Sequence, residues 1–326
     1  MKLRIQVVYI ALLLLVLPMS SVAQEHMIGY AGFAGFQASM WAVKDLGLLK
    51  KYGVDGEVVM IPGTARQIQA LVGNSLAFAH LDAAGAIRAV LGGADIVLVG
   101  SSLNKFPFSF VTQKEIRKPE DLKGKKIGIV GFGGGNDLAV TLVLKEWNIP
   151  RESVTVLQSG GGANRLVAMS AKALDATVLS YPELGEALRM GMNELGKLSD
   201  LKSADYPMTA VAVRRPFLQK NRQVVKRFLM AYAEGTYQFK TDKEKGMAVY
   251  RRRLKQENPK ALEETYEYFA PKFSFPIRVS HDGMRNTLEM IGKGDPKAET
   301  KLDKYVDESI LDELEKEGFF KKIAGN

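Results

Sequence analysis

The sequence alternates short apolar runs with amphipathic stretches, and this alternation begins twice. From residue 25 onward, strand-like runs and helical patterns follow each other in turn, which is typical of a mostly parallel α/β sheet. The same alternation starts again at the lysine-rich turn "KGKKIG" (123–128). One continuous sheet is the alternative. The restart favours two α/β lobes, each with its own mostly parallel sheet flanked by helices.

Two extended stretches are predicted to connect these lobes. "FPFSFVTQ" (106–113) leaves the first unit without a preceding helix, and "YPMTAVAVRRPF" (206–217) leads back before a helical tail. Two extended connections of this kind form a two-stranded hinge. The tail pattern predicts about four amphipathic helices. The predicted domains are 24–107 with 208–326 for the first lobe, and 108–207 for the second.

The first 23 residues have the form of a signal peptide. Lys2 and Arg4 precede an apolar run over 7–17, which is too short to favour a membrane span. Small residues place the predicted cleavage after Ala23, and an uncleaved membrane anchor is the alternative. The residue after the cut is glutamine rather than cysteine, so nothing indicates a lipid anchor. We therefore expect the mature protein to be exported across the inner membrane.

Composition excludes several classes of function. The chain has no cysteine, which excludes disulfides, thiolate zinc sites and cysteine nucleophiles. The one dense basic run, "YRRRLKQ" (250–256), lies in a charged helical stretch, and no arginine-aromatic pattern of nucleic-acid binding is present. The sequence also lacks His-x-x-x-His, G-x-S-x-G and carboxylate pairs at metal spacing. We expect no cofactor, no metal site, no nucleic-acid partner and no catalytic residue.

Four glycine loops lie between a strand-like run and a helical pattern: "AGFAG" (31–35), "PGT" (62–64), "GFGGGN" (131–136) and "SGGGA" (159–163). Glycine lets the backbone approach a ligand closely, and the helix N-terminus that follows offers free N–H groups to anions or carbonyl oxygens. Ligands of open α/β sheets bind beyond the carboxyl ends of the strands. The loops therefore predict a cleft lined by amides from both lobes. The alternative is that each loop is only a tight turn.

A nucleotide site is not supported by these loops. "GFGGGN" matches only the first two glycines of G-x-G-x-x-G, because Asn136 stands where the third should be, and no P-loop motif is present. We predict that Asn136 caps a helix starting near Asp137. After the third strand, His80 could line the cleft or could be a hydrogen-bonded structural histidine. Asp82 is better explained as a helix N-cap than as a cleft carboxylate.

Four stretches carry a resemblance to a known family: "IGYAGFAGFQASMWAVKDLGLLKKYGVDGEVVMIPG" (28–63), "KPEDLKGKKIGI" (118–129), "LDATVLSYPE" (174–183) and "VVKRFLMAYAEGTYQFKTDKEKGMAV" (224–249). They resemble periplasmic substrate-binding proteins of the nitrate/sulfonate/taurine/bicarbonate (NitT/TauT-type) ABC transporters, in the thiamine-pyrimidine-synthase-like superfamily. The resemblance covers essentially the mature chain. It implies a type II periplasmic binding protein that closes on a small ligand and then docks on an ABC permease at the inner membrane.

The resemblance also implies ligand-binding residues at the strand ends of both lobes. Many relatives have Ser or Thr where this chain has the glycines of "GGGND", so the loop offers amides but few hydroxyls. The implied residues are Phe33, Ala34, Gly35, Phe36, Gln37, Thr64, Ala65, His80 and Asp82 in the first lobe, and Gly133, Gly134, Gly135, Asn136, Gly161, Gly162 and Tyr181 in the second.

The predicted function is the capture of a small organic or inorganic anion, such as a sulfonate, nitrate or a carboxylate, for delivery to an ABC importer. We expect a monomer. The alternative is an exported enzyme or a sensor of the same fold that acts on a thiamine-like pyrimidine or another heterocycle. The related thiamine-pyrimidine synthases use a reacting histidine and a cysteine-rich motif, and this chain has no cysteine.

Overall fold

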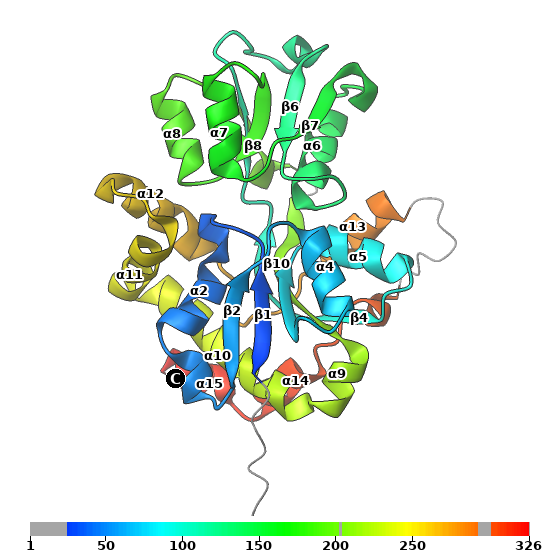
Figure 1. Cartoon of the computed structure of the whole chain (residues 1–326), viewed down its shortest axis with the longest axis vertical. Coiled ribbons are helices and arrows are strands. Elements are labelled where there is room, and N and C mark those ends of the chain that lie inside the picture. The colour runs from blue at the N-terminus through cyan, green and yellow to red at the C-terminus, as the bar shows by residue number, and fades with distance from the viewer. Residues whose placement is uncertain (1–24, 202–203, 293–300, 326) are drawn as a thin grey trace, which may run out of the picture.

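The computed structural model describes residues 25–201, 204–292 and 301–325, which form two lobes joined at a narrow waist (Figure 1). The signal peptide expected over residues 1–23 lies outside the described residues. Over the described part of the chain, no helix combines the length and the apolar character that crossing a membrane requires.

The first lobe is built on a sheet with the strand order β2-β1-β3-β10-β4. Strand β1 pairs in parallel with β2 and β3, whereas β10 is antiparallel to both β3 and β4. The strands are β1 (His26–Tyr30), β2 (Gly56–Met60), β3 (Phe78–Leu81), β4 (Ile96–Lys105) and β10 (Asp205–Arg214).

The second lobe repeats this plan with the strand order β7-β6-β8-β5-β9. Strand β6 is parallel to β7 and β8, and β5 is antiparallel to β8 and β9. The strands are β5 (Ser109–Thr112), β6 (Lys126–Ile129), β7 (Thr155–Gln158), β8 (Ala176–Leu179) and β9 (Asn193–Lys197). The predicted two-lobed α/β fold is therefore confirmed.

The hinge consists of the two places where the chain passes between the sheets, at 106–108 and between β9 and β10. The long strands β4 and β10 lead to these crossings and pair with each other up to Asp205 and Lys105. Because β10 already pairs at Asp205, the expected domain limit at 207/208 falls inside this strand. The domain limits themselves stay a prediction.

Helices flank both sheets, and the tail contains more helices than the four expected. Figure 1 shows the tail helices along the flanks and base of the first lobe. The helices of the first sheet are α2 (Ala38–Asp45), α3 (Leu48–Lys51), α4 (Thr64–Val72) and α5 (Ala83–Leu91). Those of the second are α6 (Gly135–Glu146), α7 (Gly162–Ser170) and α8 (Glu183–Arg189). The tail helices are α9 (Arg215–Lys220), α10 (Arg222–Thr241), α11 (Lys243–Leu254), α12 (Pro259–Phe269), α13 (His281–Ile291), α14 (Ser309–Lys316) and α15 (Phe319–Ala324).

The tail completes the core of the first lobe. Phe228 of α10 is fully buried and stacks on Phe78 of β3, with ring centroids 4.0 Å apart. Trp41 of α2 packs edge-on between Tyr30 and Tyr250, so α11 also contributes to this core. Burial of aromatic side chains of this size stabilises a fold strongly. The tail is therefore an integral part of the lobe.

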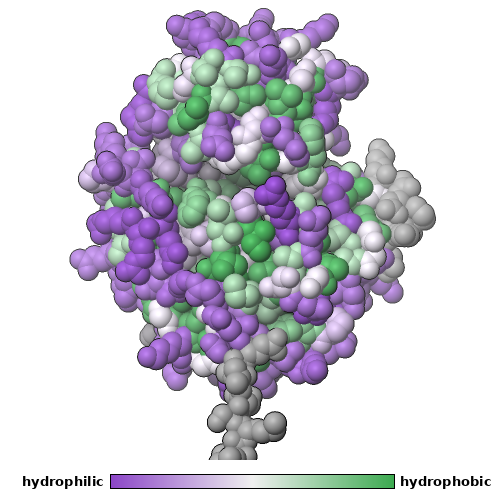
Figure 2. All heavy atoms as spheres, in the orientation of Figure 1, coloured by the Kyte–Doolittle hydropathy of each residue, from purple (hydrophilic) through white to green (hydrophobic). Residues whose placement is uncertain are grey.

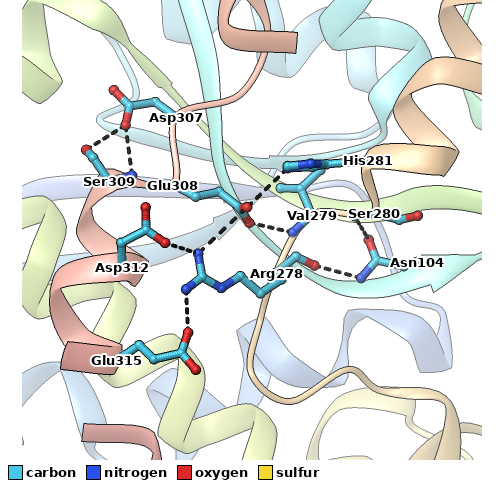
Figure 3. Close-up of polar contacts among 10 residues, drawn as sticks. All are labelled: Asn104, Arg278, Val279, Ser280, His281, Asp307, Glu308, Ser309, Asp312 and Glu315. Carbon is cyan, nitrogen blue, oxygen red and sulfur yellow. Dashed lines mark hydrogen bonds and ion pairs between the residues drawn. The ribbon is translucent and has the colours of Figure 1, made fainter. Parts of the chain in front are cut away.

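A polar network fixes the segment before α13 to the end of the hinge strand β4 (Figure 3). Arg278 donates to Asp312 and to Glu315, both at 2.6 Å, while its own carbonyl accepts from Asn104 Nδ2 at 2.8 Å. The Glu308 carboxylate accepts from the Val279 amide at 2.7 Å. Exposed ion pairs add little stability individually, but a network orients the groups that it joins. It ties α14 to the strand that enters the hinge.

Candidate functional site

The loop after β1 presents only part of its predicted residues to the surface. Phe33 is half exposed, and Ala34 and Phe36 are partly buried. Gly35 faces the lobe interior, because a methyl group placed on it would lie 2.4 Å from Cε2 of Phe269. Its carbonyl also accepts from the Tyr250 hydroxyl at 2.8 Å. Gly35 thus seats the loop on the tail helices rather than facing a ligand.

We expect Gly35→Ala to destabilise the protein by about 2 kcal/mol, because overpacking a closed contact forces the neighbouring rings apart. Thermal unfolding followed by circular dichroism measures this effect. Gly32→Ala in the same loop is the matched control, since a methyl group there would meet nothing within 4 Å. Equal melting temperatures for the two variants would contradict the close contact at Gly35.

His80 lies in the core of the first lobe. It is 1% exposed, with Nδ1 2.7 Å from Oε1 of Gln37 and Nε2 2.8 Å from the Tyr232 hydroxyl. Burial lowers the pKa of His80 to about 3, so the ring is neutral. Both ring nitrogens and the Gln37 oxygen are therefore engaged inside the lobe. The structural histidine is the correct alternative, and the expectation that His80 and Gln37 line the cleft is wrong.

Asp82 caps α5, as predicted, through a hydrogen bond from the Gly85 amide at 3.1 Å. Its carboxylate also accepts from the Tyr206 hydroxyl at 2.7 Å and from the hydroxyl of Thr64. The side chain is 4% exposed. Asp82 consequently joins the starts of α4 and α5 to the hinge strand β10.

The triple-glycine loop of the second lobe differs from its prediction at the helix start. Helix α6 begins at Gly135 with Gly134 as its N-cap, and Asn136 lies inside the helix, where it accepts a hydrogen bond from Arg165. Asp137 instead closes the loop by accepting from the Gly133 amide at 2.8 Å. The predicted Asn136 cap and the helix start near Asp137 are wrong. Glycine's freedom matters at Gly133, whose φ is +81°.

This loop lies directly against the first lobe. Arg88 Nε donates to the Gly133 carbonyl at 3.2 Å. A methyl group on Gly134 would lie 3.5 Å from Oδ2 of Asp82 and 3.8 Å from Oγ1 of Thr64. One on Gly135 would lie 3.2 Å from the Tyr206 hydroxyl. The structure thus brings Thr64 and Asp82 together with the glycine loop from the opposite lobe.

The lobes also meet on the side of α8 and α12. The rings of Tyr181 and Tyr268 lie 5.0 Å apart, and Arg189 forms an ion pair with Glu264 at 3.0 Å. Figure 2 shows the surface hollowed between the lobes, with apolar and neutral residues and some strongly hydrophilic ones across the middle of this face. Tyr181 therefore lies at a contact between the lobes.

The remaining predicted residues lie at helix starts. Ala65 and Gly161 are exposed at the beginnings of α4 and α7, and a methyl group on Gly161 would meet nothing within 4 Å. One on Gly162 would lie 3.0 Å from Cδ of Glu183. Burial raises the pKa of Glu183, while its own amide and the charge of Arg165 lower it.

Arg165 of α7 is a functional candidate that sequence reasoning missed. It is 3% exposed. Its guanidinium donates to the Asn136 side chain, to the Gly160 carbonyl at 3.3 Å and to the Val178 carbonyl at 3.0 Å. Burial lowers its pKa to about 10 although the charge of Glu183 opposes this, so Arg165 stays charged at neutral pH. The available signal was one arginine among the small residues of "GGGANRLVAMSA".

Two concavities lie away from the glycine loops. One of about 390 Å³ lies at the amino ends of β1 and β3 and the carboxyl end of β10, beside His26, Arg214 and Lys220. The other, of about 350 Å³, lies beside Lys105, Phe106 and other hinge residues. Within the described ranges, no three His, Asp or Glu side chains are grouped as metal ligands would be. We place the candidate site at the glycine loops, where residues of both lobes converge.

Comparison with known proteins agrees with this architecture. A binding protein of Brucella abortus (strain 2308) is 28% identical over 215 residues. The matched residues make up 64% of this chain and 66% of the Brucella protein, so the match spans just under two thirds of that relative's length. The periplasmic nitrate-binding protein NrtA from Synechocystis PCC 6803 has a TM-score of 0.75 at 15% identity. The match covers 91% of this chain and 89% of the NrtA chain. The periplasmic aliphatic sulphonate binding protein SsuA from Escherichia coli has a TM-score of 0.69 at 18% identity. The match covers 88% of this chain and 99% of the SsuA chain.

At these identities the solved structures show a shared fold. The family model described as "NMT1/THI5 like" matches residues 37–245, which is more than half of the chain and spans both lobes. The chain belongs to the NMT1/THI5-like family.

Proposed function

We propose that this protein is an extracytoplasmic solute-binding protein that captures a small anion between its lobes and delivers it to an ABC importer. The observation that carries the proposal is the convergence of glycine loops at the carboxyl ends of parallel strands from both sheets. Gly134 of one lobe faces Thr64 and Asp82 of the other. The fold shared with nitrate- and sulfonate-binding proteins supports the same function.

The chemistry of the loops favours an anion. Helices α4, α6 and α7 begin at these loops without side-chain caps, so their first N–H groups are available to a ligand. The buried charge of Arg165 lies beneath the loops of the second lobe. We propose that a sulfonate, nitrate or a carboxylate contacts the following residues: Phe33, Ala34, Phe36, Thr64, Ala65, Gly133, Gly134, Gly135, Gly161, Gly162 and Tyr181. We also propose the domain limits 24–107 with 208–326, and 108–207.

A thermal-shift screen against nitrate, sulfonates, carboxylates, pyrimidines and flavins tests this function. A ligand at a hundred times its dissociation constant stabilises the folded state by about 2.7 kcal/mol. We expect an anion to stabilise the protein. We also expect NMR to show that this anion is chemically unchanged after prolonged incubation with the protein. Conversion of the compound would favour the enzyme alternative. Stabilisation by neutral heterocycles alone would contradict anion capture.

We expect Gly134→Val to weaken binding of the anion found in this screen about tenfold or more, which corresponds to about 1.4 kcal/mol of binding free energy. The melting temperature should change little. The φ of Gly134 is −102°, which valine tolerates, but its methyl groups would enter the space towards Thr64 and Asp82. Calorimetric titration measures the affinity. Gly134→Ala is the control, because its single methyl group makes only ordinary contacts. Wild-type affinity in Gly134→Val would remove this loop from the site.

A further inference from the structure

A buried guanidinium joins the three βα loops of the second lobe. Arg165 reaches Asn136 after β6, Gly160 after β7 and the end of β8 at Val178. All three acceptors are neutral amide or carbonyl oxygens. The loop positions therefore depend on one side chain that lies behind the proposed ligand surface.

The positive charge of this side chain has no close counter-ion in the part of the chain that the structure describes. Among residues 25–201, 204–292 and 301–325, no carboxylate oxygen lies within 4 Å of a guanidinium nitrogen of Arg165, so Arg165 forms no ion pair there. Its Nε atom is buried and has no hydrogen-bond partner in the same part of the chain. Removing a cation from water is costly unless opposite charge is brought close to it. An anion bound at the loops would offset that cost, whereas a neutral ligand would not.

Glu183 is the carboxylate whose charge acts on Arg165. It lies at the start of α8, beside Gly162 at the start of α7. Burial disfavours its ionised form and raises its pKa. Glu183 and Arg165 are not within ion-pair distance of each other, so the carboxylate compensates the guanidinium only in part. The interior of the second lobe consequently favours negative charge in a ligand.

We propose that Arg165 is the charge-selecting positioning residue of the ligand site. It holds the loops after β6, β7 and β8 together and makes them prefer an anion over a neutral molecule of the same shape. This inference rests on the proposed function, because it assigns the charge preference of that same site to one residue.

The test compares matched ligand pairs by calorimetric titration at neutral pH. The probes are butanesulfonate with butyl methyl sulfone, and pentanoate with pentanamide. The wild-type protein is expected to prefer an anion over its neutral partner, and Arg165→Gln to reduce that ratio by at least about tenfold. Arg165→Lys keeps the charge but loses the planar set of donors. It should weaken both members of a pair and leave their ratio near that of the wild type.

Glu183→Gln provides an arm in which Arg165 is intact, so the test holds even if Arg165→Gln fails to fold. Removing the neighbouring carboxylate should raise the preference for the anion. An unchanged or lower preference in Glu183→Gln would overturn the inference. Equal weakening of both ligands in a folded Arg165→Gln protein would also overturn the inference. Neither of these two results would contradict anion capture itself. A wild-type protein that binds neither of these anions nor nitrate would contradict the proposed function itself.

Discussion

Lowering the pH below 6.5 is expected to destabilise the protein through His80. Burial lowers the pKa of His80 from its ordinary value of 6.5 to about 3. Between these two values the unfolded chain binds a proton that the folded chain does not. The contribution of His80 to the free energy of unfolding should therefore be largest above pH 6.5 and fall by about 1.4 kcal/mol for each pH unit below it. Urea unfolding curves between pH 7 and about 5 measure this slope.

His80→Gln isolates the contribution, because it lacks the titrating ring and keeps the other histidines. Burial also lowers the pKa of His26, but His26 is present in both proteins and its effect cancels in the difference. Tyr232→Phe is a second control, since it removes the hydroxyl beside Nε2 and leaves His80 in place. Parallel stability curves for the wild type and His80→Gln would show that His80 does not titrate as a buried neutral group.

Asp82→Ala is expected to reduce the free energy of unfolding by about 3 kcal/mol. The change removes the cap of α5 and leaves the buried hydroxyl of Tyr206 without the carboxylate oxygen at 2.7 Å. Urea unfolding measures the loss. Asp82→Asn should cost less, because its amide oxygen still accepts one of these bonds.

A double-mutant cycle with Tyr206→Phe separates the hinge contact from the cap. We expect a coupling energy of about 1–2 kcal/mol, since the hydroxyl and the carboxylate interact directly in a buried position. Additive losses would mean that Asp82 acts only as the cap of α5. A negligible loss in Asp82→Ala would contradict the contacts on both sides of the carboxylate.

The sequence predicted the features that depend on local pattern. Alternating apolar runs gave the two sheets, and a polar residue before an apolar run identified Asp82 as a cap. The direction that a loop residue faces depends instead on distant partners. Gly35 faces inward because of Phe269, and His80 is engaged by Tyr232, which is 152 positions away. Neither partner can be read from the neighbourhood of these residues.

The same reason explains the errors at the ligand loops. Asn136 is a good N-cap residue on propensity alone. Its side-chain oxygen accepts a hydrogen bond from Arg165, which is 29 positions further along. The helix therefore starts earlier, and no side chain caps its first backbone N–H groups. Arg165 itself has no motif, since its importance comes from three acceptors on separate strands and loops. Long-range contacts therefore decide the detail of the site, while local pattern decides the architecture around it.

The position of β10 has a consequence for the order in which the protein folds. Within the described residues, strand β4 pairs in its sheet with β10 alone, and Leu98 of β4 forms an isolated bridge to Val306, still further along the chain. All strands of the second lobe, in contrast, lie in one continuous stretch from Ser109 to Lys197. Pairing between distant segments is slow because the intervening loop must be closed first. We expect the central segment of the chain to fold first, and the lobe that contains the N-terminal strands to be completed last.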